Sequence, residues 1–217
     1  MPVIPRRPLR DQVQLEIRER IIDGRLPAGA SLNEVRLSGD LGISRTPLRE
    51  AMLALEATGF LASAMGHGFR VPTLEAAEFL GLAAMLARLE PLAIASSPDP
   101  SAGKLMEMQN LVQRARLAAG QPGPRTTAAA AALLPGFSAL LLGGCPNAPL
   151  RQDVMRLHAL GARYWFAAVA AGFPAGALVA YVEKLYAEVH ARRRAAAADH
   201  IAASLEPLAD QATTLLP

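Results

Sequence analysis

The fold of the first part of this chain is decided by residues 31–71, which read SLNEVRLSGDLGISRTPLREAMLALEATGFLASAMGHGFRV. Ser31 and Glu34 have the spacing of a capping box, so we predict that a helix begins at 31 or 32 with Ser31 as its N-cap. Gly42 can supply the left-handed residue that ends this helix. Ser44 then opens a second helix. Two short helices joined by a turn that contains glycine form a helix-turn-helix motif.

A further helix precedes this motif and a hairpin follows it. Between Leu9 and Ile21 an apolar residue recurs every fourth position, which is typical of an amphipathic helix. Residues 60–65 and 69–71 predict two short strands joined by a small tip that is rich in glycine. Such a hairpin is a wing. Residues 1–73 are therefore predicted to form a winged helix-turn-helix domain with three helices and a small β-hairpin.

The composition restricts the class of protein. The chain has 217 residues, of which 52% are hydrophobic and only 5% aromatic, and 22 Lys+Arg against 19 Asp+Glu give a formal charge of +3. This aliphatic content is more typical of packed helices than of sheets. Cys145 is the only cysteine, and residues 1–10 lack the apolar core of a signal peptide. We therefore predict a cytoplasmic protein that does not associate with a membrane.

The second helix of the motif carries the predicted DNA contacts. In a helix-turn-helix this helix enters the major groove with its N-terminus first. Arg45 and Arg49 stand four residues apart on one helix face, a spacing that suits guanine or phosphate. The alternative interpretation is a solvated face on which these arginines pair with nearby acids. The predicted DNA-binding residues are Arg36, Ser44, Arg45, Thr46, Arg49, Gly66, His67 and Gly68.

Residues 15–71 resemble a known family. The runs IIDGRLPAG at 21–29, LGISRTPLREA at 41–51, LEATGFL at 55–61 and GHGFRV at 66–71 resemble the winged helix-turn-helix domain of GntR-family transcription regulators. The resemblance implies a bacterial regulator that binds operator DNA, commonly as a homodimer on a palindromic site. It also implies DNA contact at the eight residues named above.

Residues 74–217 are predicted to form a second domain. Breaks that contain Gly, Pro or Arg divide it into about six helices joined by short loops. This pattern predicts an all-α antiparallel bundle, which can enclose a small-molecule cavity. After a GntR-type head, such a domain resembles the FadR-type ligand domain, also called FCD, in its shorter VanR-like variant.

Many members of that family bind a metal ion through one Asp and three His. In this sequence His200 stands at one of the four positions, and the other three are Leu134, Ser138 and Leu178. We therefore predict neither a metal ion nor another cofactor. The remaining bundle histidines, His158 and His190, are interpreted as partly exposed helix residues.

We place the effector-binding residues at Arg163, Tyr164 and His200. An arginine beside aromatic side chains suits an anionic or aromatic effector. Aromatic residues at this spacing are also common in cores and dimer contacts, and His200 is either a cavity-lining group or a core imidazole.

The sequence as a whole predicts a sequence-specific DNA-binding regulator, a repressor, which is controlled by a small-molecule effector in the second domain. In the alternative, the second domain only dimerises and has lost its ligand. An enzyme is not predicted, because Cys145 in its Gly-Gly-Cys-Pro loop lacks an evident histidine base.

Overall fold

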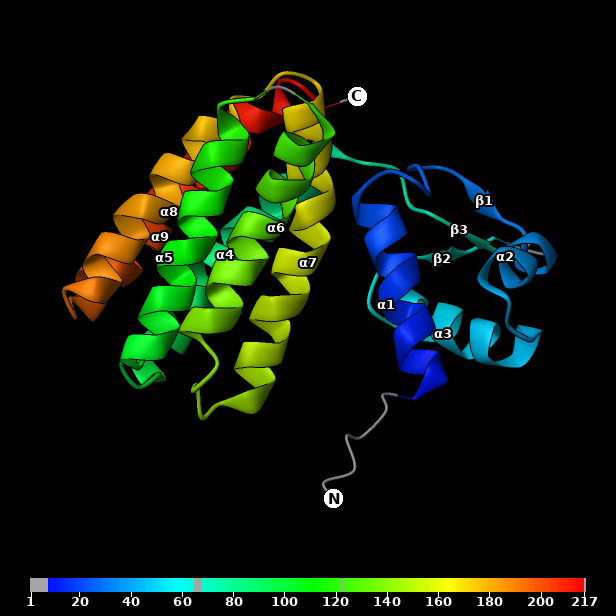
Figure 1. Ribbon diagram of the computed structural model, residues 1–217, viewed down its shortest axis with the longest axis horizontal. Helices are drawn as coiled ribbons and strands as arrows, with labels where there is room; N and C mark the ends of the chain where they lie inside the picture. Colours follow the sequence, from blue (N-terminus) through cyan, green and yellow to red (C-terminus); the bar gives the residue numbers. More distant parts are fainter. Residues whose placement is uncertain (1–7, 65–67, 122, 217) are drawn as a thin grey trace. The chain divides into compact units, whose positions relative to one another are not determined.

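The computed structural model of this protein describes residues 8–64, 68–121 and 123–216. The chain forms two compact units with the boundary between Thr73 and Leu74 (Figure 1). We call them the N-terminal unit and the helical unit. The fold is mainly helical, and the small sheet lies in the N-terminal unit. This confirms the predicted fold class, a winged helix-turn-helix domain followed by a helical domain.

The described part of the N-terminal unit contains α1 (Leu9–Ile22), β1 (Ser31–Leu32), α2 (Glu34–Leu41), α3 (Arg45–Ala57), β2 (Ala62–Ser63) and β3 (Phe69–Arg70). The core forms where α1 packs on α3, and Ile17, Leu48 and Met52 there are fully buried. The three strands pair antiparallel in the order β1-β3-β2. The predicted hairpin is thus extended by a third strand.

The third strand corrects the predicted start of α2. Ser31 is not a helix cap, because Ser31 and Leu32 pair with Arg70 and Phe69 across the sheet. The N-cap is Asn33, whose side-chain oxygen accepts hydrogen bonds from the backbone N–H groups of residues 35 and 36 at 2.9 and 3.0 Å. The strand pairing occupies the residues that a capping box would have used.

The two wing strands are shorter than predicted. The sequence predicted strands over 60–65 and 69–71, whereas β2 and β3 have two residues each. Phe60 and Leu61 are only 2% exposed. Burial in the core therefore accounts for the apolar character of these two residues, which lie outside β2.

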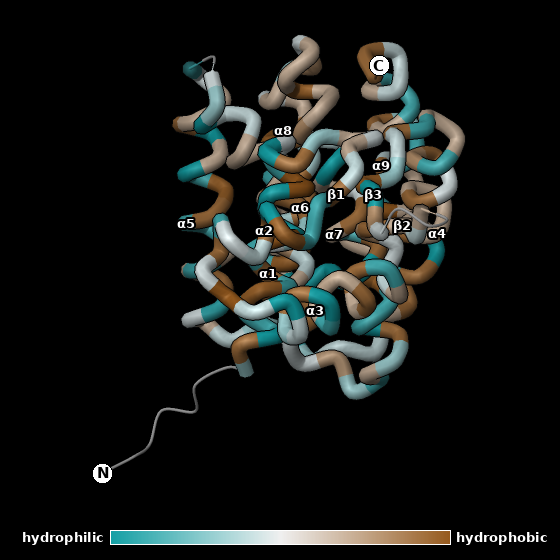
Figure 2. The backbone as a smooth tube through the Cα atoms, turned by 90° about the vertical axis from the view of Figure 1, so that its right-hand side faces the viewer, coloured by the Kyte–Doolittle hydropathy of each residue, from teal (hydrophilic) through white to brown (hydrophobic). Residues whose placement is uncertain are grey.

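The described residues of the helical unit form α4 (Ala76–Ser96), α5 (Ala102–Ala119), α6 (Pro124–Leu141), α7 (Ala148–Ala170), α8 (Ala175–His190) and α9 (Arg194–Thr213). The helix boundaries fall at the predicted Gly, Pro and Arg breaks. The helices lie side by side, with α6 in contact with α5, α7 and α8, and α4 in contact with α7 and α9. Hydrophobic and hydrophilic segments alternate along α5, as expected for a helix with one buried face (Figure 2).

One helix is unusually apolar. Among the described residues, only α4 is long and apolar enough to cross a membrane by length and composition. In the structure α4 packs against α7 and α9, and its buried side chains include Phe79, Leu82 and Leu86. A core helix of a bundle passes the same test of length and composition.

Candidate nucleic-acid interface and the bundle core

The helix α3 has one buried face and one exposed face. Gly42 ends α2 with a φ of +65°, as predicted, and Ser44 is the N-cap of α3. Leu48, Met52 and Leu55 have no exposed surface, so they fix the rotation of α3 about its axis. The opposite face carries exposed side chains, namely Ser44, Arg45, Thr46 and Arg49.

Two of the predicted DNA-binding arginines pair weakly with acids. Arg49 lies 3.6 Å from Glu34, and Arg36 lies 3.9 Å from Asp40. The side chains of these arginines are 65% and 84% exposed. Exposed pairs of this kind contribute about 0–1 kcal/mol, so a phosphate group can replace the acid at little cost. Within the described residues, Arg45 has no acidic partner.

The described part of the wing lies beside the start of α2. Gly68 has a φ of +79°, and a Cβ at this position would lie 3.7 Å from the backbone oxygen of Leu32. Its carbonyl oxygen accepts a hydrogen bond from the N–H of Ala64 at 2.8 Å. Arg70 on β3 is exposed. The predicted contacts Gly66 and His67 lie outside the described residues.

The predicted effector residues Arg163 and Tyr164 lie in a packed cluster between α4 and α7. Tyr164 stacks on Phe79 at 4.8 Å, and its hydroxyl donates a hydrogen bond to Glu78. Burial and the neighbouring Glu78 raise the pKa of the Tyr164 phenol. Arg163 is 3% exposed, and its guanidinium carbon lies 5.9 Å from the Tyr164 ring; burial lowers the pKa of this guanidinium.

The predicted residue His200 uses both nitrogens of its ring. Its Nε2 is 2.9 Å from the carbonyl oxygen of Tyr181, and its Nδ1 is 3.2 Å from the hydroxyl of Ser204. The rings of His200 and Tyr181 lie 4.8 Å apart. The structure therefore places His200 next to α8, while Arg163 and Tyr164 interact with α4.

A polar cluster in the bundle core was missed by the sequence analysis. Glu90 of α4, Ser138 of α6 and His158 of α7 are 1%, 3% and 3% exposed. The Ser138 hydroxyl donates a hydrogen bond to Glu90, and the Nε2 atom of His158 lies 3.0 Å from both Ser138 and Glu90. The expectation that His158 is partly exposed is thus wrong, whereas His190 is exposed.

Helix periodicity could have found two members of this cluster. Glu90 stands four residues after Leu86, on the buried stripe of α4. His158 stands four residues after Val154, on the buried stripe of α7. An acid and an imidazole on such stripes require partners, because an unpaired charge in a core is costly.

The residues at the family's metal positions do not fit a metal ion. Leu134 and Leu178 have no donor atoms, Ser138 is bound to Glu90, and both nitrogens of His200 are engaged. In the part of the chain that the structure describes, no group of three or more His, Cys, Asp or Glu residues is arranged to hold one.

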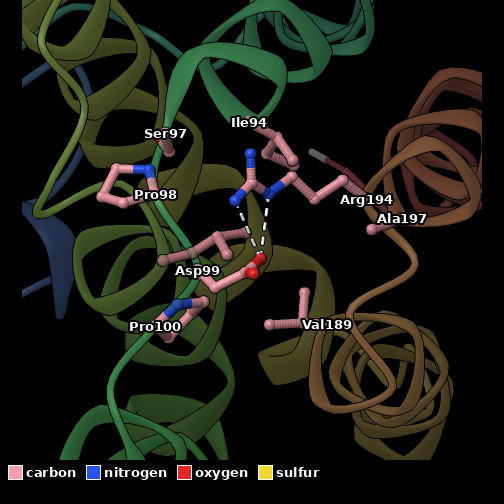
Figure 3. A pocket seen from close by; sticks show the side chains of 9 residues that line it. Ile94, Ser97, Pro98, Asp99, Pro100, Val189, Arg194 and Ala197 are labelled. Atoms are coloured by element: carbon pink, nitrogen blue, oxygen red, sulfur yellow. Dashed lines mark hydrogen bonds and ion pairs between the residues drawn. The ribbon is translucent and has the colours of Figure 1, made fainter.

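A small pocket lies at the C-terminal end of α4. Figure 3 shows the guanidinium of Arg194 directed at the carboxylate of Asp99, with Pro98, Pro100 and Val189 around the pair. The Nε and Nη2 atoms of Arg194 are 3.0 and 2.9 Å from Asp99. Because the two charges satisfy each other, this pocket presents no unpaired charge from this pair to a ligand.

Comparison with known proteins defines the class of the N-terminal unit. Residues 9–71 match the family described as bacterial regulatory proteins of the gntR family. The described part of the N-terminal unit is therefore similar to the DNA-binding domain of gntR-family regulators. Regulators of this family are not enzymes.

Curated relatives match a part of the chain. The chain is 36% identical over 85 residues to the probable D-xylose utilization operon transcriptional repressor of Paenarthrobacter nicotinovorans. This match covers 39% of this chain and 36% of the relative. The chain is 42% identical over 66 residues to the Nta operon transcriptional regulator of Aminobacter aminovorans, covering 30% and 31%. The matches thus span roughly a third of these relatives.

Solved structures show the same fold over nearly the whole chain. The structure of McbR/YncC from E. coli superposes with a TM-score of 0.77 at 20% identity and covers 95% of both chains. A GntR regulator from Rhodococcus sp. RHA1 superposes with a TM-score of 0.73 at 20% identity, covering 96% of this chain and 99% of that one. The fold, a winged helix domain followed by a helical domain, is therefore shared with these two solved structures.

Proposed function

We propose that this chain is a GntR-family transcriptional regulator that binds operator DNA through α3. The observation that carries the proposal is the two-sided character of α3. Its apolar face is fully buried, and its other face presents Arg45, Thr46 and Arg49 to solvent from the first turns of the helix. A helix held in this way can place its N-terminal residues at base edges and phosphates of the major groove.

The proposed contacts come from α3, from α2 and from the wing. Arg45 and Arg49 suit guanine or phosphate, and Ser44 and Thr46 suit phosphate. Arg36 on α2 would contact the DNA backbone, and the wing, to which Gly66, His67 and Gly68 belong, would reach the minor groove. A repressor of this kind acts in the cytoplasm, where its operator lies.

Selection from a random DNA library tests this proposal. The full chain is expected to enrich a palindromic sequence, and Arg45→Ala is expected to lose the enrichment. Arg88→Ala removes an exposed arginine of the helical unit and serves as the matched control. Failure of the unmodified chain to enrich any sequence would contradict the proposal.

We further propose that the helical unit binds an effector and holds two copies together, as in the FCD-type domain it resembles. The dimer contact is placed on the outer face of α4. Met85 and Leu92 on this face are 46% and 60% exposed, although the other face of α4 is buried in the bundle. A helix that is apolar on both faces is expected to be covered on both.

A second candidate is a helical unit that only dimerises. The observation that favours it is the dense packing around Tyr164. The ring of Tyr164 stacks on Phe79 at 4.8 Å, and the neighbouring Arg163 is only 3% exposed. Native mass spectrometry of the purified protein separates the two candidates. A dimer that carries a stoichiometric small molecule supports the effector domain, and a dimer that remains ligand-free with a panel of metabolites supports the second candidate.

A further inference from the structure

A small recess lies inside the bundle between α4, α7 and α9. Its walls include Phe79, Leu82, Leu86, His158, Gly161 and Trp165, and all six are buried. The free volume is about 10 Å³, which is room for about one water molecule. His158 is the one ionisable side chain of the lining. The recess is therefore a small, mainly apolar cavity with the imidazole of His158 in its wall.

Gly161 keeps part of this space open. It stands in the interior of the 23-residue helix α7, where glycine is less favourable than alanine. A Cβ built at Gly161 would meet nothing within 4 Å. At Gly136 of α6, by contrast, a Cβ would lie 3.2 Å from the side chain of Leu111, so close packing explains that glycine. Packing does not explain Gly161, but an unfilled site beside it does.

The hydrogen bonds of His158 define what the recess can recognise. Both hydrogen bonds of this ring to described residues use Nε2, whose partners are Glu90 and Ser138. When Nε2–H donates to the Glu90 carboxylate, Nδ1 is left as a hydrogen-bond acceptor. A ligand that meets this atom needs a donor, such as a hydroxyl or an N–H group.

The charge behind His158 restricts the ligand further. Glu90 is 1% exposed, and an anion placed near a buried carboxylate is disfavoured. The hydroxyl of Tyr181 is also buried, and no residue in the described ranges accepts or donates a hydrogen bond to it. Burial and the neighbouring Glu90 raise the pKa of the Tyr181 phenol. The buried carboxylate of Glu90 thus disfavours an anionic ligand in the recess.

We propose that the recess is the closed form of the effector site and that it selects a small, neutral aromatic molecule with one hydrogen-bond donor. Phe79 and Trp165, which meet edge to face at 4.9 Å, supply the aromatic wall. The donor of the ligand binds His158, and the side chains around Gly161 move apart to admit the ring. This inference rests on the proposed role of the helical unit as an effector domain.

Three probes of matched size test the proposal on the full chain. Phenol has the donor, toluene lacks it, and benzoate carries a negative charge. Methyl NMR with labelled leucines reports the position of binding, because Leu82, Leu86 and Leu205 line the recess. Phenol is expected to shift these methyl signals and to bind with an affinity about tenfold higher than that of toluene, because one additional hydrogen bond changes affinity by about this factor. Benzoate is expected to leave the signals unchanged. Equal or tighter binding of benzoate, or phenol shifts confined to other leucines, would overturn the proposal.

Two variants at one position provide the matched control. Gly161→Leu is expected to fill the recess and remove the phenol shifts, while Gly161→Ala keeps the helix and adds only a methyl group. If Gly161→Leu does not fold, the position of the phenol shifts in the unmodified chain decides the question. Operator affinity with and without phenol is measured on the same samples. Phenol bound at the recess without any change in operator affinity would support the site and contradict effector control.

Discussion

The two units use their polar side chains in opposite ways. On α3 the arginines are exposed, and the pair between Arg49 and Glu34 is a loose contact at 3.6 Å. In the bundle, Glu90 and His158 are at most 3% exposed and lie 3.0 Å apart. Solvent makes the first pair easy to exchange for a phosphate, whereas the second pair cannot separate without leaving a charge in an apolar core. The ion pair of the N-terminal unit can therefore be exchanged for another partner, whereas the pair in the helical unit is fixed by its burial.

The largest expected effect breaks the pair in the bundle. Glu90→Leu leaves His158 and Ser138 without their acceptor and is expected to lower the free energy of unfolding by about 3–5 kcal/mol. The double variant Glu90→Leu with His158→Leu removes both partners and is expected to recover part of this loss. Urea denaturation of the single and double variants measures the difference. A double variant that is less stable than Glu90→Leu would show that the pair is not the source of the effect.

The second prediction concerns the exposed side of the comparison. Arg45→Ala and Arg49→Ala are each expected to weaken specific DNA binding by about 1–3 kcal/mol if they read bases. The free energy of unfolding should stay nearly constant, because neither side chain is buried. Fluorescence anisotropy with the selected site and a scrambled site measures the effect. An equal loss on both DNAs would assign these arginines to phosphate contacts.

A smaller effect tests the cap of α2. Asn33→Ala removes the side chain that caps two backbone N–H groups and is expected to cost about 1 kcal/mol of stability. Ser31→Ala is the matched control, and it should be nearly neutral because Ser31 lies in β1. Thermal unfolding of the two variants distinguishes them. A larger loss for Ser31→Ala would restore the capping box that the sequence suggested.

The smallest effect concerns the loose ion pair itself. Glu34→Gln removes the partner of Arg49 and is expected to change stability by less than about 1 kcal/mol. DNA binding should become tighter, because Arg49 no longer shares its charge and a nearby acid is removed. Anisotropy titrations at two salt concentrations check this expectation. Weaker binding would instead mean that Glu34 holds Arg49 in its binding position.

The sequence predicted those features that depend on neighbouring residues. Gly42 ends α2, Ser44 precedes α3, and the bundle breaks at its Gly, Pro and Arg stretches, because such signals act within a few residues. It did not predict β1, since the partner of Ser31 is Arg70, far along the chain. The capping box that the local sequence indicates does not form, because in the folded chain Ser31 pairs with Arg70 instead.

The candidate site divides in the same way. The face of α3 follows from helix period, so Arg45 and Arg49 could be chosen from the sequence. The cluster of Glu90, Ser138 and His158 could not be predicted in this way, because its members come from three different helices. Ser138 lies 48 residues after Glu90, and His158 lies 68 residues after it. Periodicity places each residue on a buried stripe but does not say which stripes face each other.

The pairing of β1 with β3 has a mechanical consequence for DNA binding. β1 ends one residue before the N-cap of α2, and β3 is the strand that leaves the wing, so backbone hydrogen bonds hold the wing at a set distance from the helix-turn-helix. In the proposed complex with DNA, this pairing would keep the spacing between the helix-turn-helix and the wing fixed. We expect a DNA sequence whose grooves have this spacing to bind without distortion, and a sequence with another spacing to bind more weakly because it must first be deformed.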